Sequence, residues 1–183
     1  MPAEYPRRFK ALRTDMKNII LIGMPGSGKS TVGVILAKSA GMEFTDTDLL
    51  IQKKTGKKLQ EIIDSYGIDY FLKTESDILS EVSCEHSVIS TGGSAVCTEI
   101  AMNHLKRLGT VVFLDVPIDE IKRRINNITT RGIAMRRGET LECLYEERLP
   151  LYKKYADITV TGSTTEETVK KILESINDMH PKS

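Results

Sequence analysis

Residues 23–31 carry the pattern of this chain that is most specific for a chemical role. They read GMPGSGKST and match G-x-x-x-x-G-K-[S/T] without a mismatch. Gly26 and Gly28 allow a tight turn in which backbone N–H groups and the positive end of a following helix converge on phosphates. Lys29 would reach the outer phosphates as a point charge, and the Ser30 hydroxyl would complete the shell of a magnesium ion. The run therefore predicts that the protein binds a nucleoside triphosphate.

The alternative for this run is a glycine turn that only joins a strand to a helix. An apolar run at 20–22 precedes it, and apolar residues with helical spacing follow it, namely Val32, Ile35, Leu36 and Ala40. Strand, loop, lysine and helix thus come in the order that a phosphate-binding loop requires. This context favours phosphate binding.

Two carboxylates, Asp46 and Asp48, lie two residues apart at the end of an expected strand. In an extended segment both would project to the same side, because side chains alternate along a strand. One carboxylate could organise magnesium while the other accepts a proton from an attacking hydroxyl. The alternative is that these acids cap the N-terminus of a helix at 49–55. The spacing alone leaves both interpretations open.

Two further segments have a composition that suits a kinase. Gly92 and Gly93 would allow a substrate to approach the backbone closely, although paired glycines also occur in ordinary turns. Residues 125–138 are polar, rich in arginine and bounded by glycine. A mobile lid of this kind suits phosphoryl transfer, because fixed cations must meet the charge on the transferring oxygens while water is excluded. The alternative is a solvated basic loop.

The candidate residues would be positioned by short apolar runs that alternate with longer helical patterns. We expect strands at 18–22, 43–46, 87–90, 110–114 and 157–160. We expect helices at 59–66 and 69–84, and a capping box formed by Thr164 and Glu167 before the last helix. This alternation predicts an α/β fold with a parallel sheet, whose ligands bind at the carboxyl ends of the strands.

Length and composition exclude several classes of protein. A chain of 183 residues suits one domain, which we place at 18–183 behind a basic extension at 1–17. The net charge of +1 argues against a nucleic-acid partner. No apolar run approaches the roughly 20 residues of a membrane span. The three cysteines lie far apart and no signal-like segment precedes the domain, so we expect reduced thiols and a cytoplasmic protein.

Together the motifs resemble those of shikimate kinase, a family of nucleoside monophosphate kinase-like P-loop kinases. The resemblance runs from about Asn18 to the C-terminus. It rests on the phosphate-binding run, on Thr45-Asp46-Thr47-Asp48 followed by Thr55-Gly56, on Gly92-Gly93, on the segment 124–131 and on Arg148-Leu149-Pro150-Leu151-Tyr152. It implies a three-layer α/β/α fold with a five-stranded parallel sheet in the order 2-3-1-4-5. It also implies acceptor-binding helices at about 48–85 and a lid at about 125–138.

The resemblance implies a function, phosphorylation of the 3-hydroxyl of shikimate in aromatic amino acid biosynthesis, with ATP and Mg²⁺ as cofactors and a monomeric enzyme. It would assign ATP binding to Gly26, Ser27, Gly28, Lys29, Ser30, Thr31, Arg124 near the adenine and Arg131 on the lid. Magnesium would be held by Ser30 and Asp46. The acceptor would be held by Asp48, Gly92, Gly93 and, at its carboxylate, Arg148. Catalysis would depend on Lys29, Asp48 as base, and Arg131.

Two positions depart from the family pattern, and both lie on the acceptor side. The family usually has an arginine that grips the shikimate carboxylate where this chain has Leu72, and neighbouring Lys73 points about 100° away around a helix. Ser94 stands in place of the family's third glycine, where it is either strained or adds a hydroxyl to the pocket. Two alternatives therefore stay open. One is a related kinase for another small hydroxylated metabolite, such as a hydroxy amino acid or polyol, and the other is a non-catalytic ATP-binding regulator.

Overall fold

The computed structural model of the chain describes residues 17–125 and 132–179. The expected basic extension, apart from Lys17, lies outside these residues, as does the expected lid arginine, Arg131.

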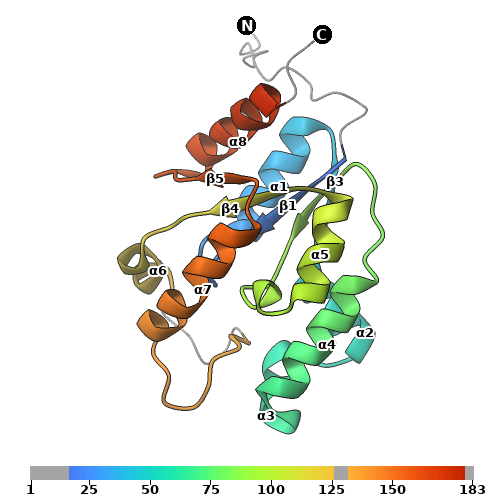
Figure 1. Cartoon of the computed structure of the whole chain (residues 1–183), viewed down its shortest axis with the longest axis vertical. Coiled ribbons are helices and arrows are strands. Elements are labelled where there is room, and N and C mark those ends of the chain that lie inside the picture. Colours follow the sequence, from blue (N-terminus) through green and yellow to red (C-terminus); the bar gives the residue numbers. More distant parts are fainter. Residues whose placement is uncertain (1–16, 126–131, 180–183) are drawn as a thin grey trace, which may run out of the picture.

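A sheet of five parallel strands forms the centre of the fold (Figure 1). The strands are β1 (Asn18–Ile22), β2 (Glu43–Asp46), β3 (Ser87–Ser90), β4 (Gly109–Leu114) and β5 (Ile158–Val160). Their order is β2-β3-β1-β4-β5, which confirms the predicted topology. Every strand lies within one residue of its expected bounds. The apolar runs of β1 and β4 gave the clearest signal, whereas β2 contains only one apolar residue, Phe44.

Helices cover both faces of the sheet because side chains of successive strand residues point to opposite faces. Ile19 and Leu21 of β1 pack with helices α1 (Lys29–Ala40) and α8 (Thr165–Met179). Ile20 and Ile22 pack on the other face with α5 (Glu99–Leu108), α6 (Ile118–Arg124) and α7 (Leu141–Tyr155). The fold is therefore the predicted three-layer α/β/α arrangement of a P-loop kinase.

A group of helices follows β2 and lies at the end of the molecule opposite α8 (Figure 1). It comprises α2 (Thr47–Thr55), α3 (Leu59–Tyr66) and α4 (Ile68–Ser80). Buried Ile51, Ile62 and Phe71 belong to a separate apolar cluster that holds these helices together. The expectation that α4 runs to residue 84 is wrong. Val82 turns into the core and His86 adopts a left-handed φ of 49°, which redirects the chain into β3.

Within the described ranges 17–125 and 132–179, every helix is too short or too polar to cross a bilayer.

Candidate active site

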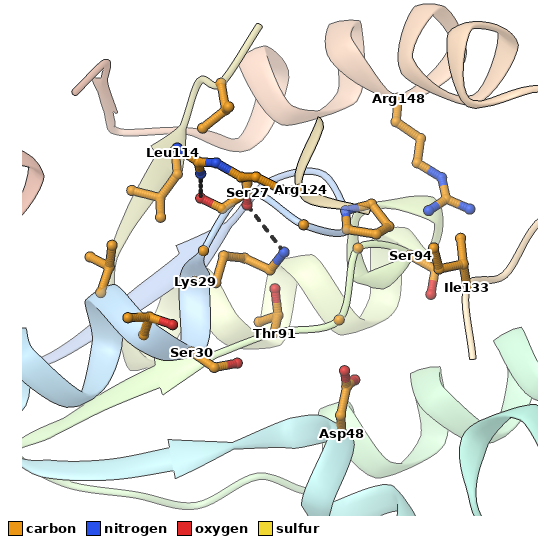
Figure 2. Close-up of a pocket in the computed structure, with 18 of the residues that line it drawn as sticks. Ser27, Lys29, Ser30, Asp48, Thr91, Ser94, Leu114, Arg124, Ile133 and Arg148 are labelled. Atoms are coloured by element: carbon orange, nitrogen blue, oxygen red, sulfur yellow. Dashed lines mark hydrogen bonds between the residues drawn. The ribbon is translucent and has the colours of Figure 1, made fainter. Parts of the chain in front are cut away.

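A cavity of about 510 Å³ opens at the carboxyl ends of the strands, where ligands of such sheets bind. The phosphate-binding loop forms one part of its wall, and residues from α2, α4 and α7 form another. Figure 2 shows Asp48 and Arg148 pointing into the space between them, with Lys29 and Arg124 at the loop. The cavity therefore joins the two sets of residues that the sequence singled out.

The phosphate-binding loop has the backbone that its glycines predict. Gly26 and Gly28 have φ values of 78° and 93°, a region that favours glycine, and Gly28 leads directly into α1. The loop therefore presents the N-terminus of a twelve-residue helix to the cavity.

Lys29 is buried inside this loop. Its Nζ donates to the carbonyl oxygens of Gly23 and Met24, each at 2.8 Å. Burial lowers the pKa of Lys29 to about 8, although nearby Asp48 and Asp46 act in the opposite direction. The ammonium is thus held next to the expected phosphate position, with a proton affinity well below that of an ordinary lysine.

Asp46 caps a helix and also contacts the phosphate-binding loop. One of its carboxylate oxygens accepts the backbone N–H of Asp48 at 2.9 Å and so caps α2. The other accepts the Ser30 hydroxyl at 2.7 Å. A hydroxyl and a carboxylate are the hard oxygen ligands that Mg²⁺ prefers, and Mg²⁺ commonly takes only one or two protein ligands beside phosphate and water. The pair therefore fits a magnesium ion, although the described residues contain no cluster of three or more His, Cys, Asp or Glu side chains.

Asp48 lies in the first turn of α2 and its carboxylate enters the cavity (Figure 2). Burial raises the pKa of Asp48 to about 6, and the neighbouring charge of Asp46 adds to this effect. A carboxylate with a pKa near neutrality is better suited to accept a proton than an ordinary aspartate.

Arg148 and Glu75 are charged side chains that the fold buries beside the cavity, with 4% and 2% of their surface exposed. Arg148 donates through Nη2 to the carbonyl of Ala134, whereas its Nη1 has no partner among the described residues. Glu75 accepts the Ser94 hydroxyl at 2.6 Å, and its Oε1 likewise lacks a partner within the described part of the chain. Buried polar atoms without partners are costly, so both atoms are suited to contact a polar ligand.

Glu75 was not among the site residues predicted from the sequence. Its only signal in the sequence is its place three residues after Leu72, where the family usually has an arginine. Burial raises the pKa of Glu75 to about 7, and the Ser94 hydroxyl partly opposes this shift.

The glycine pair packs where side chains would not fit. A Cβ atom on Gly92 would lie 2.5 Å from Glu75 Oε1 and 2.8 Å from Asp48 Oδ1, so the absence of a side chain lets two carboxylates approach one backbone position. The carbonyl of Gly93 accepts the hydroxyl of buried Tyr152 at 2.6 Å. Ser94 has a φ of −93°, so it is unstrained and contributes a hydroxyl to the pocket.

Leu72 does not line the cavity. It is half-buried and packs against the apolar cluster of α2, α3 and α4, and Lys73 is exposed. Neither residue places a cation beside Glu75.

The remaining predicted ATP residues are only partly described. Ser27 and Thr31 line the cavity within the loop and at the start of α1. Arg124 lies against the loop, where its Nη1 donates to the Ser27 carbonyl at 3.3 Å and its Nε donates to Glu120 at 2.9 Å. Arg131, the expected lid residue, lies outside the described residues.

The loop between β5 and α8 also lines the cavity, which the sequence analysis missed. It contributes Gly162, Ser163 and Thr164, and Thr165 at the start of α8 also lines the cavity. Half of the expected capping box is present: Thr164 Oγ1 accepts the N–H of Glu167 at 3.2 Å, whereas the Glu167 carboxylate accepts from Ser163. The sequence offers one signal for this loop: it follows the fifth strand, and the carboxyl ends of all strands in a parallel sheet lie at the same edge, where ligands bind.

A phosphate loop after the first strand of a sheet in this order, opening into a shared cavity, defines a P-loop kinase. The family model described as "Shikimate kinase" matches residues 25–177. The chain belongs to the shikimate kinase family, a family of phosphotransferases that use ATP and act on a hydroxyl group, and this confirms the predicted family.

The chain is similar to shikimate kinases from several bacteria. It is 41% identical to the enzyme from Clostridium botulinum strain Eklund 17B over 88% of this chain and 98% of the relative. It is 39% identical to the solved shikimate kinase of Aquifex aeolicus, with a TM-score of 0.76 over 90% of this chain and 99% of the other. The shikimate kinase of Acinetobacter baumannii, solved in complex with shikimate, has a TM-score of 0.85 at 31% identity over 92% of this chain and 97% of the other.

Proposed function

We propose that this protein transfers the γ-phosphoryl group of ATP to the 3-hydroxyl of shikimate. The main support for this function is that the phosphate loop shares one cavity with Asp48 and Arg148 and faces them across it. Membership of the shikimate kinase family, and the similarity to an enzyme solved with shikimate, support this choice of acceptor.

On the donor side, backbone N–H groups of the loop and the N-terminus of α1 bind the phosphates of ATP. Lys29 contributes its charge at the outer phosphates, and Arg124 binds the nucleotide beside Ser27. Ser30 and Asp46 would hold Mg²⁺, which would neutralise part of the charge of the phosphates.

On the acceptor side, Asp48 accepts the proton of the attacking hydroxyl. Its raised pKa and its position in the cavity support this role. Arg148 pairs with the carboxylate of the acceptor through the Nη1 that has no partner among the described residues. Gly92 and Gly93 allow the acceptor to approach the backbone.

The charge that develops on the transferring group requires cations fixed around it. Lys29 supplies one of them, held by the carbonyls of the loop. Arg131 supplies another from the lid, an assignment that rests on the family resemblance.

A related acceptor is the second candidate, and Leu72 is the observation that favours it. Its side chain packs in an apolar cluster, so the pocket lacks the cation that the family usually places there. Another small hydroxylated acid or polyol would then be the better substrate.

The test is a coupled assay of ADP release with shikimate beside a panel of hydroxylated acids and polyols. We expect release that depends on both ATP and shikimate and that is lost in Lys29→Ala. Turnover only with another acceptor would favour the second candidate. ATP binding without turnover on any acceptor would indicate a regulator.

We also propose a monomer in the cytoplasm. The described chain supplies residues for both halves of the cavity by itself, which supports a monomer. The three cysteines are free, which suits a reducing compartment. Light scattering after size exclusion at working concentration would test the monomer.

A further inference from the structure

We propose that Ser94 is a positioning residue for the acceptor, acting through Glu75 and compensating for the absence of a cation at position 72. The inference rests on the proposed function, because it assigns the means by which this particular pocket holds its acceptor.

The contact between Ser94 and Glu75 is direct and enclosed. The Ser94 hydroxyl donates to Glu75 Oε2 at 2.6 Å, and both residues are buried, with 5% and 2% of their surface exposed. Bonds to a charged group are stronger than neutral ones, and low local polarity strengthens them further. Among the described residues, this is the only side-chain hydrogen bond that Glu75 makes.

Position 72 explains why such a donor is needed. It precedes Glu75 by three residues on α4, so an arginine there would be a near neighbour of the Glu75 carboxylate on the helix surface. Leu72 instead packs with the apolar cluster, which leaves the carboxylate without a cation from its own helix. Ser94, nineteen residues later on the loop after β3, supplies a donor from a different segment of the chain.

The result is a carboxylate with one oxygen fixed and the other available. Oε2 is taken by Ser94, whereas Oε1 lies over Gly92 beside Asp48 and has no partner in the described chain. Oε1 can therefore accept a hydroxyl of the acceptor, with the orientation of the carboxylate set by Ser94. Without the hydroxyl, Glu75 would be free to rotate and would lose part of its preference for the charged form.

The charged groups that act on Glu75 come from three other helices. Asp48 on α2 raises its pKa, whereas Arg148 on α7 and Lys29 on α1 lower it. The Ser94 hydroxyl also lowers it, so removal of this hydroxyl raises the pKa and moves protonation of Glu75 to higher pH.

The test is Ser94→Ala, assayed with ATP and shikimate between pH 6 and pH 8.5. We expect the KM for shikimate to rise about ten- to a hundredfold, with kcat and the KM for ATP within about threefold of wild type. The pH below which the KM for shikimate rises should also move upward. Ser80→Ala is the matched control, since among the described residues its hydroxyl bonds only to the Ser76 carbonyl within α4, and it should leave all three parameters unchanged.

A second variant, Leu72→Arg, tests whether Ser94 compensates for the missing cation. In the Ser94→Ala background it should restore most of the lost affinity for shikimate, whereas in wild type it should lower the KM by much less. Such a difference between the two backgrounds would show that Ser94 and an arginine at position 72 act on the same group, rather than that Ser94→Ala damages the pocket in general.

If Ser94→Ala does not fold, as judged by thermal unfolding, Ser94→Gly removes the same hydroxyl at a φ that glycine readily adopts. An active wild type with an unchanged KM and pH profile in the hydroxyl-free variant would overturn this inference and leave the proposed function intact. A wild type inactive with shikimate would overturn the proposed function, and this inference with it.

Discussion

The cavity has two halves, a phosphate half and an acceptor half, and they use different groups of the protein. The phosphate half is made mainly of backbone from one short segment, and even its lysine is held by main-chain carbonyls of that segment. The acceptor half is made of charged side chains, Asp48, Glu75 and Arg148, brought together from α2, α4 and α7. We therefore expect substitutions in the acceptor half to affect the kinetics with shikimate, and substitutions in the phosphate half to affect the kinetics with ATP.

The largest effect is expected for Asp48→Asn, which keeps the shape of the side chain but removes its ability to accept a proton. We expect kcat to fall about 10²- to 10⁴-fold, the usual contribution of a general base, with the Kd for ATP within about threefold. Turnover assays and calorimetric ATP titration measure the two quantities. Asp77→Asn, the same change at an exposed position of α4, is the control. Equal losses in turnover and ATP binding would show that Asp48 does not belong to the acceptor half.

Arg131→Ala should lower kcat about 10²- to 10³-fold, because it removes charge that is met mainly in the transition state. Its effect on the KM for shikimate should be small. Steady-state kinetics with Arg107→Ala as a control at an exposed arginine of α5 would check this. An unchanged kcat would remove the lid assignment.

Arg148→Lys should raise the KM for shikimate about ten- to a hundredfold. It keeps the charge but loses the fork of donors that fits a carboxylate while also bonding to Ala134. The KM for ATP should stay close to wild type. If ATP were affected more than shikimate, Arg148 would belong to the donor half.

The smallest expected effect is a difference between the pH profiles of kcat/KM for shikimate and for ATP. Burial raises the pKa of Asp48 to about 6 and of Glu75 to about 7, so their charged forms are lost as pH falls, and kcat/KM for shikimate should decline below about pH 7. Burial lowers the pKa of Lys29 to about 8, so its charge is lost as pH rises, and kcat/KM for ATP should decline above about pH 8. Profiles that fall at the same pH for both substrates would contradict the separation.

The sequence predicted the strands and the phosphate half well because both are local. A buried strand is a continuous apolar run, and the loop is nine consecutive residues whose spacing is itself the function. The hydrogen bond between Ser94 and Glu75 joins a loop residue to a helix residue nineteen positions away, and no local sequence pattern predicts such a contact. The β5–α8 loop was missed for the same reason, since its role comes from where the sheet places it. The end of α4 was missed because tertiary packing of Val82 overrides the helical pattern.

The most direct test of the proposed phosphoryl transfer is to identify the product formed from ATP and shikimate by ³¹P NMR. We expect one ADP to be released for each shikimate phosphorylated, with the phosphate on the 3-hydroxyl, and we expect this product to be lost in Asp48→Asn although ATP still binds. ADP release without phosphorylated shikimate, or a phosphate on a different hydroxyl, would contradict it.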